Sequence, residues 1–150
     1  MFRAKVISIM VGSFSDAWEE VYIAKETIRK WNQINAERTG KLFMPVEWTT
    51  KTEGIQNVDV VTGVIGNWIE NEGFIERCIE HGKQVMLFFN TNQDPTNTIM
   101  SEQNEVVRFH TIMKEHCYCA NFSKASELSL TLSERLDIID DNRSDMVISK

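Results

Sequence analysis

The sequence predicts a three-layer α/β fold, in which a five-stranded parallel sheet of strand order 2-1-3-4-5 lies between two layers of helices. Short runs of β-branched and apolar residues alternate along the chain with longer segments whose apolar residues recur at three and four. This alternation is typical of βαβ units, whose strands are parallel. The length of 150 residues suits one domain, and there is no repeat or interdomain linker.

Five runs are predicted to be strands. The first, Lys5 to Val11, is dense in apolar residues, which is typical of a strand covered on both faces. In the second, Pro45 predicts an edge position, because proline lacks an amide donor. The predicted strands are Lys5 to Val11, Leu42 to Trp48, Val58 to Ile65, Gln84 to Phe89 and Cys117 to Phe122.

Four segments between and after these strands are predicted to be helices. The first follows Asp16, whose spacing from Glu19 predicts a capping box, and it ends near Gly40. The others run from about Asn71 to His81 with Gly82 as a left-handed cap, from about Thr98 to Glu115, and from Ser123 through Leu136. Thr49 to Asn57 and Asn90 to Asn97 are predicted to be loops. Residues 1–140 form the predicted domain and residues 141–150 a frayed tail.

Composition excludes several classes of function. The balance of 16 basic against 22 acidic residues gives a net charge of −6, and no basic stripe is present, so we expect no nucleic-acid partner. No apolar segment approaches the roughly 18 residues of a membrane helix, so we expect no membrane partner. Met1 to Gly12 is read as a strand and not as a signal peptide. The cysteines Cys78, Cys117 and Cys119 fit no disulfide framework, which indicates reduced thiols in a cytoplasm.

The predicted fold places any small-molecule site at one edge of the sheet. Doubly wound sheets bind ligands outside the carboxyl ends of their strands, where the strand order reverses. Here that point lies between the first and third strands, so the site is predicted between Gly12–Asp16 and Gly66–Glu72.

The first of these segments is a candidate cradle for a phosphate or a ribose. Backbone amides at a helix start bind anions, and two serine hydroxyls lie among them. The segment lacks both the Walker ending and the three spaced glycines of a dinucleotide fingerprint. The alternative is a simple turn in which Asp16 caps the helix. The candidate ligand-binding residues here are Gly12, Ser13, Phe14, Ser15 and Asp16.

The second segment brings carboxylates, amides and an aromatic ring to the same edge. Gly66, Asn67 and Trp68 are candidate ligand-binding residues, and Glu72 and Glu76 are candidate catalytic residues. A carboxylate there would stabilise positive charge on a ribose carbon as a glycosidic bond breaks. The alternative is that these glutamates belong to the solvated face of a surface helix.

Two further sets of residues are weighed for binding. Trp48 follows the second strand and either stacks on a base or covers a hydrophobic edge. The potential metal ligands His110, His116, Cys117 and Cys119 have no standard zinc spacing, so no metal site and no resident cofactor is predicted.

The ordered set of segments resembles the TIR-like domains of bacterial and phage-defence proteins, a family related in fold to nucleoside deoxyribosyltransferases and flavodoxins. The resemblance covers about Lys5 to Leu136. It rests on KVISIMVGSFSDAWEE, PVEW, VDVVTGVIGNW and IEHGKQVMLFF, in that order.

The resemblance implies a nucleotide or NAD-derived ligand at the carboxyl edge, and possible homo-oligomers. In the family's NAD-cleaving members, a catalytic glutamate stands where this chain has Phe74, which Glu72 and Glu76 flank. We therefore expect ligand binding, in signalling or defence, that need not include catalysis. The alternatives are an NAD glycohydrolase or deoxyribosyltransferase-like enzyme, and a self-associating adaptor.

Overall fold

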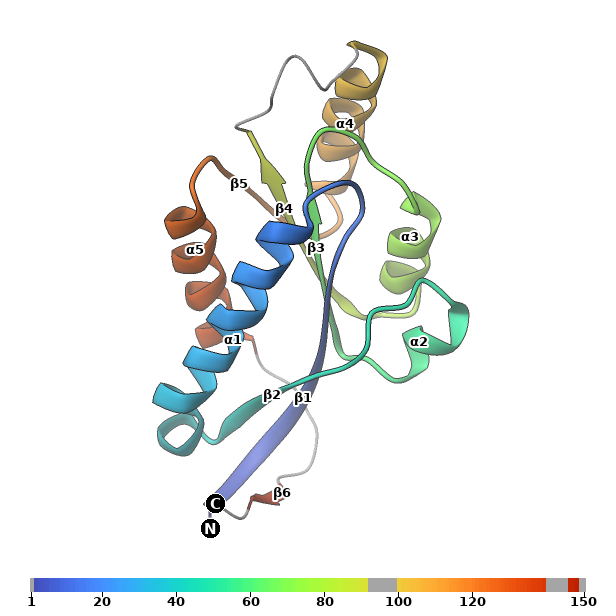
Figure 1. Cartoon of the computed structure of the whole chain (residues 1–150). Coiled ribbons are helices and arrows are strands. Elements are labelled where there is room, and N and C mark those ends of the chain that lie inside the picture. Colours follow the sequence, from blue (N-terminus) through green and yellow to red (C-terminus); the bar gives the residue numbers. More distant parts are fainter. Residues whose placement is uncertain (1, 92–99, 140–145, 149–150) are drawn as a thin grey trace.

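Five parallel strands form the centre of the molecule, in the order β2-β1-β3-β4-β5 (Figure 1). The computed structural model describes residues 2–91, 100–139 and 146–148. The strands are β1 (Phe2–Ser13), β2 (Lys41–Pro45), β3 (Val60–Ile65), β4 (Gln84–Asn90) and β5 (Tyr118–Phe122). The predicted fold class and strand order are therefore confirmed, and Pro45 lies in an edge strand as predicted.

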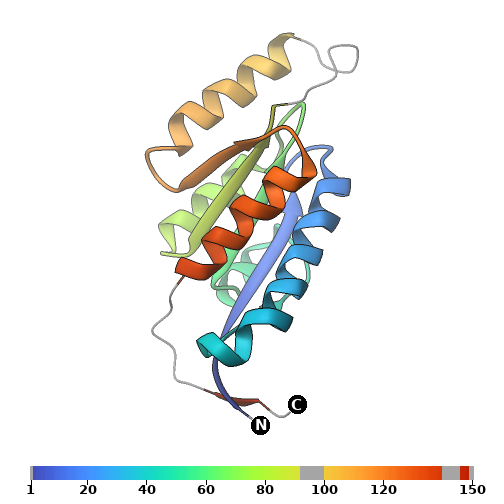
Figure 2. The ribbon, with the colours of Figure 1, turned by 90° about the vertical axis from the view of Figure 1, so that its left-hand side faces the viewer.

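Helices cover both faces of this sheet (Figures 1 and 2). One face carries α1 (Trp18–Thr39) and α5 (Ala125–Ile138). The other carries α2 (Thr52–Gln56), α3 (Glu72–Glu80) and α4 (Met100–Met113). None of the described helices is long and apolar enough to cross a membrane.

The sheet separates two hydrophobic cores. Alternate residues of a strand point to opposite faces, so in β1 Ile9 packs beneath α1 and α5 while Met10 packs beneath α2 and α3. All six residues of β3 are buried, because this strand has neighbours on both sides and helices on both faces. Such double burial explains why the strands read as continuous apolar runs.

Several predicted boundaries were wrong. The segment predicted as a loop from Thr49 to Asn57 contains α2, whose Ile55 is buried in the second core. Strand β2 ends at Pro45, so Trp48 lies outside it. The predicted Asn90–Asn97 loop begins after Asn90, the last residue of β4, and its residues 92–97 lie outside the described residues, as do residues 98 and 99 of the predicted third helix.

The end of the chain adds a sixth strand that the sequence did not predict. Strand β6 (Met146–Ile148) pairs antiparallel with the first residues of β1, with Phe2 opposite Ile148 and Ala4 opposite Met146 (Figure 2). The prediction of a frayed tail was wrong for these three residues, because the start of β1 extends beyond its pairing with β2 and offers a free edge. Residues 140–145 and 149–150 lie outside the described residues.

Candidate functional site

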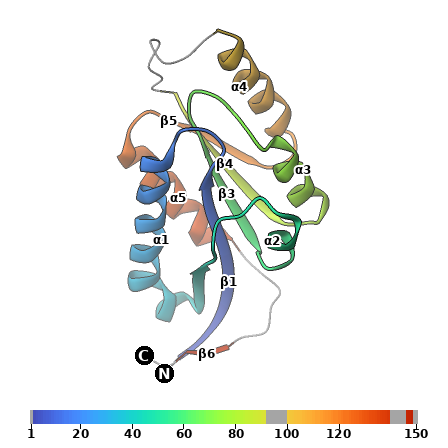
Figure 3. The same ribbon diagram turned by 45° about the vertical axis from the view of Figure 1, so that its right-hand side comes forward.

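The exit loops of β1 and β3 lie side by side at the carboxyl edge of the sheet, where the site was predicted (Figures 1 and 3). Two backbone hydrogen bonds join them. The Phe14 N–H donates to the Val64 carbonyl at 3.1 Å, and the Glu70 N–H donates to the Phe14 carbonyl at 2.7 Å. The strand order thus brings together two segments that lie about fifty residues apart in the sequence.

The serine hydroxyls of the first loop bind the protein itself. Ser13 Oγ accepts hydrogen bonds from the backbone N–H groups of Ser15 at 3.0 Å and Ala17 at 2.9 Å. Ser15 Oγ accepts one from the Gly66 N–H at 2.6 Å. Both serines are buried. The predicted cradle of free amides and hydroxyls was therefore wrong for these groups, since their hydrogen bonds are used to shape the loop.

Asp16 joins the two loops and does not cap α1. Its carboxylate accepts hydrogen bonds from the Asn67 backbone N–H at 3.0 Å, from Asn67 Nδ2 at 2.8 Å and from Ser15 Oγ at 3.1 Å. The N-cap residue of α1 is Ala17, which has no side-chain capping bond. The predicted Asp16–Glu19 capping box was wrong, because the two donors of Asn67 hold the carboxylate at the other loop.

These contacts set the protonation of Asp16. Partial burial raises the pKa of the Asp16 carboxyl, but the hydrogen bonds donated by the backbone and side chain of Asn67 and by Ser15 together outweigh it. The net result is a pKa below the usual 3.8, so the carboxylate is ionised at neutral pH.

Two glycines allow this close packing. A Cβ atom at Gly66 would lie 2.3 Å from Asp16 Oδ1, and one at Gly12 would lie 2.1 Å from the ring of Trp48. Trp48 therefore lies directly over the backbone of β1. Of the two roles considered for this side chain, the structure shows the covering of a hydrophobic edge.

Trp48 belongs to an aromatic cluster beneath the site. Its ring meets Phe14 edge-on at a centroid distance of 5.1 Å, Trp18 at 6.2 Å and Phe74 at 6.3 Å. Phe14 and Phe74 are also stacked, at 6.3 Å, and both are buried. Phe14 is therefore a core residue of the site's floor, and Trp68, half-buried in the β3 exit loop, is not part of the cluster.

The candidate catalytic glutamates lie outside this network. Glu72 is half-buried in the first turn of α3 and Glu76 is exposed one turn later. Neither side chain forms a hydrogen bond or an ion pair with another described residue. Phe74, between them, points into the aromatic cluster, so the side of α3 that faces the sheet presents a ring and not a carboxylate.

One polar atom at the junction of the loops lacks a partner. Asn67 Oδ1 is enclosed, yet it accepts no hydrogen bond within the described part of the chain. A buried acceptor without a donor costs about 1–3 kcal/mol, so this oxygen is an atom at the junction with hydrogen-bonding capacity left unused.

The edge also includes residues that the sequence did not indicate. Asn90, at the end of β4, donates from Nδ2 to Glu20 Oε1 at 3.3 Å and so extends the polar edge from β3 to β4. A polar residue directly after the apolar run of β4 was the available signal. Five carboxylates belong to the two exit loops or to the first helical turns that follow them: Asp16, Glu19, Glu20, Glu70 and Glu72. This charge disfavours phosphate groups and favours ligands that offer hydroxyl or amino donors.

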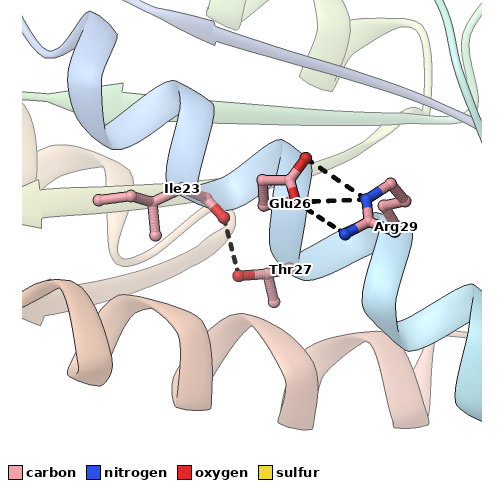
Figure 4. Close-up of polar contacts among 4 residues, drawn as sticks. All are labelled: Ile23, Glu26, Thr27 and Arg29. Atoms are coloured by element: carbon pink, nitrogen blue, oxygen red, sulfur yellow. Dashed lines mark hydrogen bonds and ion pairs between the residues drawn. The ribbon is translucent and has the colours of Figure 1, made fainter.

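A hollow with a volume of about 480 Å³ lies between α1 and α5. Figure 4 shows part of α1 here: Thr27 Oγ1 donates to the Ile23 carbonyl at 2.8 Å, and Arg29 pairs with Glu26 at 2.9 Å. Thr27 Oγ1 also lies 3.0 Å from Ser129 Oγ of α5. The contact between Thr27 and Ser129 joins the two helices.

Metal-binding residues are not grouped in the described structure. Among the residues it covers, no three His, Cys, Asp or Glu side chains are placed to hold one ion. His110 instead stacks on Phe89 with ring centroids 4.1 Å apart. Burial, and then the nearby Lys114, lower the pKa of His110, so the ring is neutral at pH 7.

No family model and no curated protein matches the chain. A structure of S. aureus homoserine dehydrogenase at pH 7.0 superposes with a TM-score of 0.51 at 9% identity, over 93% of this chain and 44% of that one. The same enzyme at pH 7.5 gives a TM-score of 0.48 at 9% identity, over 79% and 33%. A short-chain flavodoxin associated with a bacterial microcompartment gives 0.47 at 10% identity, over 91% and 95%.

These likenesses concern the fold alone. The chain spans less than half of the dehydrogenase chains, and the identities of 9–10% carry no information about chemistry. The strand order 2-1-3-4-5 and the two helical layers define an α/β fold of the flavodoxin-like class.

Proposed function

We propose that this protein is a non-catalytic binding module for a nucleotide or NAD-derived small molecule, which binds at the junction of the β1 and β3 exit loops. The ligand meets this edge through its ribose hydroxyls and base amino groups. The observation that carries the proposal is the enclosed Asn67 Oδ1, an acceptor without a donor at the topological switch point.

The acidic surroundings support this orientation of the ligand. A phosphate placed beside Asp16 and Glu70 meets like charge, whereas a ribose hydroxyl or a base amino group supplies the proton that Asn67 Oδ1 lacks. The phosphates of such a ligand therefore point away from the junction, into solvent.

Phe74 supports binding without cleavage. Cleavage of an N-glycosidic bond needs a carboxylate close to the ribose carbon that becomes positive. The residue that faces the sheet is Phe74, packed against Phe14 and Trp48. Glu76 is exposed, and within the described part of the chain Glu72 has no partner that holds it in one position.

Chemical-shift mapping tests the ligand and its place together. Titration with adenosine, ADP-ribose and NAD is expected to shift the amide signals of residues 13–17 and 66–71. Asn67→Ala is expected to weaken binding about tenfold, the value of one hydrogen bond of roughly 1.4 kcal/mol. Asn57→Ala, at the exposed end of α2, is the matched control and leaves affinity unchanged. Shifts confined to α5 would contradict the proposal.

Substitution of Phe74 separates binding from catalysis. Phe74→Glu places a carboxylate within the aromatic cluster, so we expect a loss of about 3–5 kcal/mol in the free energy of unfolding and no gain of NAD cleavage. Phe74→Leu, which keeps the site apolar, should lose less of the free energy of unfolding.

If the wild type cleaves NAD and Glu72→Gln or Glu76→Gln abolishes turnover, the protein is an enzyme and the non-catalytic proposal is wrong.

A second candidate function is self-association through the outer surface of α1 and α5. Tyr22 and Ile34 on α1 are 66% and 74% exposed, and Leu130 on α5 is 62% exposed. Tyr22 and Ile34 both line the hollow of about 480 Å³ between the helices. Exposed apolar side chains around a hollow are typical of protein interfaces.

Light scattering coupled to size-exclusion chromatography tests this candidate. The wild type is expected to form a dimer at high concentration, and Ile34→Lys is expected to make it monomeric. Val107→Lys on α4 is the control, because Val107 is also largely exposed, at 63%, on the other face of the sheet. A monomeric wild type at all concentrations rules out self-association without affecting the ligand proposal.

A further inference from the structure

One row of side chains follows the outer side of α1 along the hollow between α1 and α5. Residues four apart in a helix form a ridge on its surface. Here the ridge consists of Tyr22, Glu26, Lys30, Ile34 and Arg38, and all five line the hollow. Figure 2 shows α1 and α5 side by side on this face of the sheet. We call this row the α1 ridge.

The middle of the α1 ridge carries one acid and one base. The hydrogen bonds donated by Arg29 lower the pKa of the Glu26 carboxyl, so this side chain is ionised at neutral pH. Glu26 is 36% exposed and has room for a second donor. Lys30 is exposed, and its ammonium group has no hydrogen-bond or ion-pair partner among the described residues. The ridge therefore presents an unpaired cation beside a reachable carboxylate.

The order of side chains along the α1 ridge is self-complementary. In an interface with twofold symmetry, a residue that contacts a second residue of the other copy is itself contacted by that residue's counterpart. When two α1 helices run antiparallel with the axis at the level of Ile28, Glu26 lies opposite Lys30 of the second copy. Tyr22 lies opposite Ile34 of the second copy, because both pairs are centred on position 28. Each pairing then occurs twice.

The charges select this register against its neighbours. An axis at the level of Glu26 places that carboxylate against its own counterpart, and an axis at the level of Lys30 does the same to the ammonium group. Like charges opposed across an interface are unfavourable, whereas opposite charges fix the register. Only the axis at Ile28 also joins the large exposed side chains of Tyr22 and Ile34.

The shape of this face suits such a contact. A ridge of residues four apart packs into the matching groove of a second helix, with the two helix axes crossing at an angle of about 50°. The hollow provides a groove whose other wall includes Ser129 and Ser133 of α5, which are themselves four apart. Since the two α1 helices run antiparallel, the two candidate ligand sites, each at the start of α1, lie at opposite ends of the pair.

We propose that two copies of this chain form a twofold-symmetric dimer in which the α1 ridge of each packs antiparallel into the hollow of the other, with Glu26 of one copy paired to Lys30 of the second. The proposal rests on the second candidate function, self-association, and gives it a register and a set of contacts. It is independent of ligand binding at the junction of the exit loops.

Reversal of the two charges tests the ion pairs. Glu26→Lys and Lys30→Glu each convert both ion pairs into like-charge pairs, so each variant alone is expected to raise the dimer dissociation constant about a hundredfold at low ionic strength. A mixture of the two variants restores opposite charges at both contacts and should form a heterodimer as tightly as the wild type forms its dimer. Sedimentation equilibrium measures all three. Glu105→Lys, at an exposed position of α4, is the matched control.

The heterodimer separates a lost contact from a lost fold. Both substituted positions lie on the surface, and the thermal unfolding of each variant shows whether it folds. Folded variants that dimerise as the wild type does, or whose mixture forms no heterodimer, would overturn the proposed register and leave self-association standing. A wild type that is monomeric at all concentrations would overturn both, and neither result bears on the titrations with adenosine and NAD.

Disulfide trapping tests the position of the axis. Under mild oxidation, a mixture of Tyr22→Cys and Ile34→Cys chains is expected to form a mixed disulfide between these two positions faster than either chain links to itself. Peptide mapping by mass spectrometry distinguishes this bond from any that involves the native cysteines. Rapid linkage of a Lys30→Cys chain to itself would place the axis at Lys30 and overturn the pairing of Glu26 with Lys30.

Discussion

For Asp16, the sequence predicted the correct position in the loop after β1 but the wrong role, that of a helix cap. Its position after a strand and before a helix indicates a cap, since Asp favours that position. The structure satisfies the carboxylate instead with two donors of Asn67, a residue about fifty positions later. Local sequence carries no information on such a partner, because the competition between the two roles is decided by the tertiary approach of the loops.

The lowered pKa of Asp16 makes the junction sensitive to acid. A carboxyl whose pKa is lower in the folded than in the unfolded state contributes stability above the unfolded pKa, and this stability is lost as the pH falls through the folded pKa. Asp16→Asn is therefore expected to lower the free energy of unfolding by about 1 kcal/mol at pH 7, a value reduced by the exposure of Asp16. The difference from the wild type should shrink as the pH falls below the usual Asp pKa of 3.8 and through the lower pKa of the folded state.

Urea unfolding of both proteins between neutral and acidic pH measures this effect. Glu19→Gln provides the control, because Glu19 is exposed in the first turn of α1 and forms no capping box. A difference that stays constant across the whole pH range would show that Asn67 does not discriminate between the ionised and neutral forms of Asp16.

Phe74 illustrates what the sequence established at the candidate site. The comparison of motifs identified position 74 as the one that lacks the expected acid, and the structure shows why an acid there is unfavourable: the position faces Phe14 and Trp48. The predicted meeting of the two exit loops was correct. The aromatic floor was not predictable, because it joins rings from the β1 and β2 exit loops, α1 and α3.

At the scale of elements, the sequence predicted the helices with a periodic apolar stripe and the strands with continuous apolar runs, but it missed the short helix α2. Helix α2 has only five residues, too few to show a repeating apolar stripe, and its Ile55 is buried in the core. The end of α1 was predictable, because glycine commonly follows the last turn of a helix. The structure agrees: Gly40 has the left-handed φ of 73° and donates its N–H to the Ala36 carbonyl.

The carboxyl end of α5 is held by a side chain from another element. Lys41, the first residue of β2, donates from Nζ to the carbonyls of Leu136 at 3.1 Å, Asp137 at 2.8 Å and Ile139 at 2.8 Å. These carbonyls have no partner further along the helix, and a cation there also favours the helix dipole. One lysine thus joins the edge of the sheet to the last helix.

Replacement of this lysine should loosen the end of α5. Lys41→Met keeps the apolar stem but removes the donors, so we expect a loss of about 1–2 kcal/mol in the free energy of unfolding. Amide exchange should accelerate for the last turn of α5 and not for its middle. Lys25→Met, at an exposed position of α1, is the control. Unchanged exchange at residues 136–139 would mean that the three contacts contribute nothing.

At the scale of the whole molecule, alternation of apolar runs and periodic segments was sufficient for the strand order. Parallel pairing follows because each pair of successive strands is separated by a crossover segment, and the order 2-1-3-4-5 is one of few arrangements that such crossovers allow. Strand β6 was not predictable in this way, since three residues in a polar segment show no period.

Strand β6 closes the free edge at the start of β1, and its removal is the clearest test of how the two chain ends cooperate. Truncation after Ile139 leaves the Lys41 contacts with α5 intact and removes the only strand that the described structure pairs with Phe2–Ala4. We expect amide exchange to accelerate across residues 2–4 and to stay slow across residues 7–11, which β2 and β3 flank, with a loss of about 1–2 kcal/mol in the free energy of unfolding. Truncation after Ile148 keeps β6 and serves as the control. Exchange by mass spectrometry resolves the two halves of β1, and loss of protection at residues 7–11 would show instead that the sheet depends on β6 as a unit.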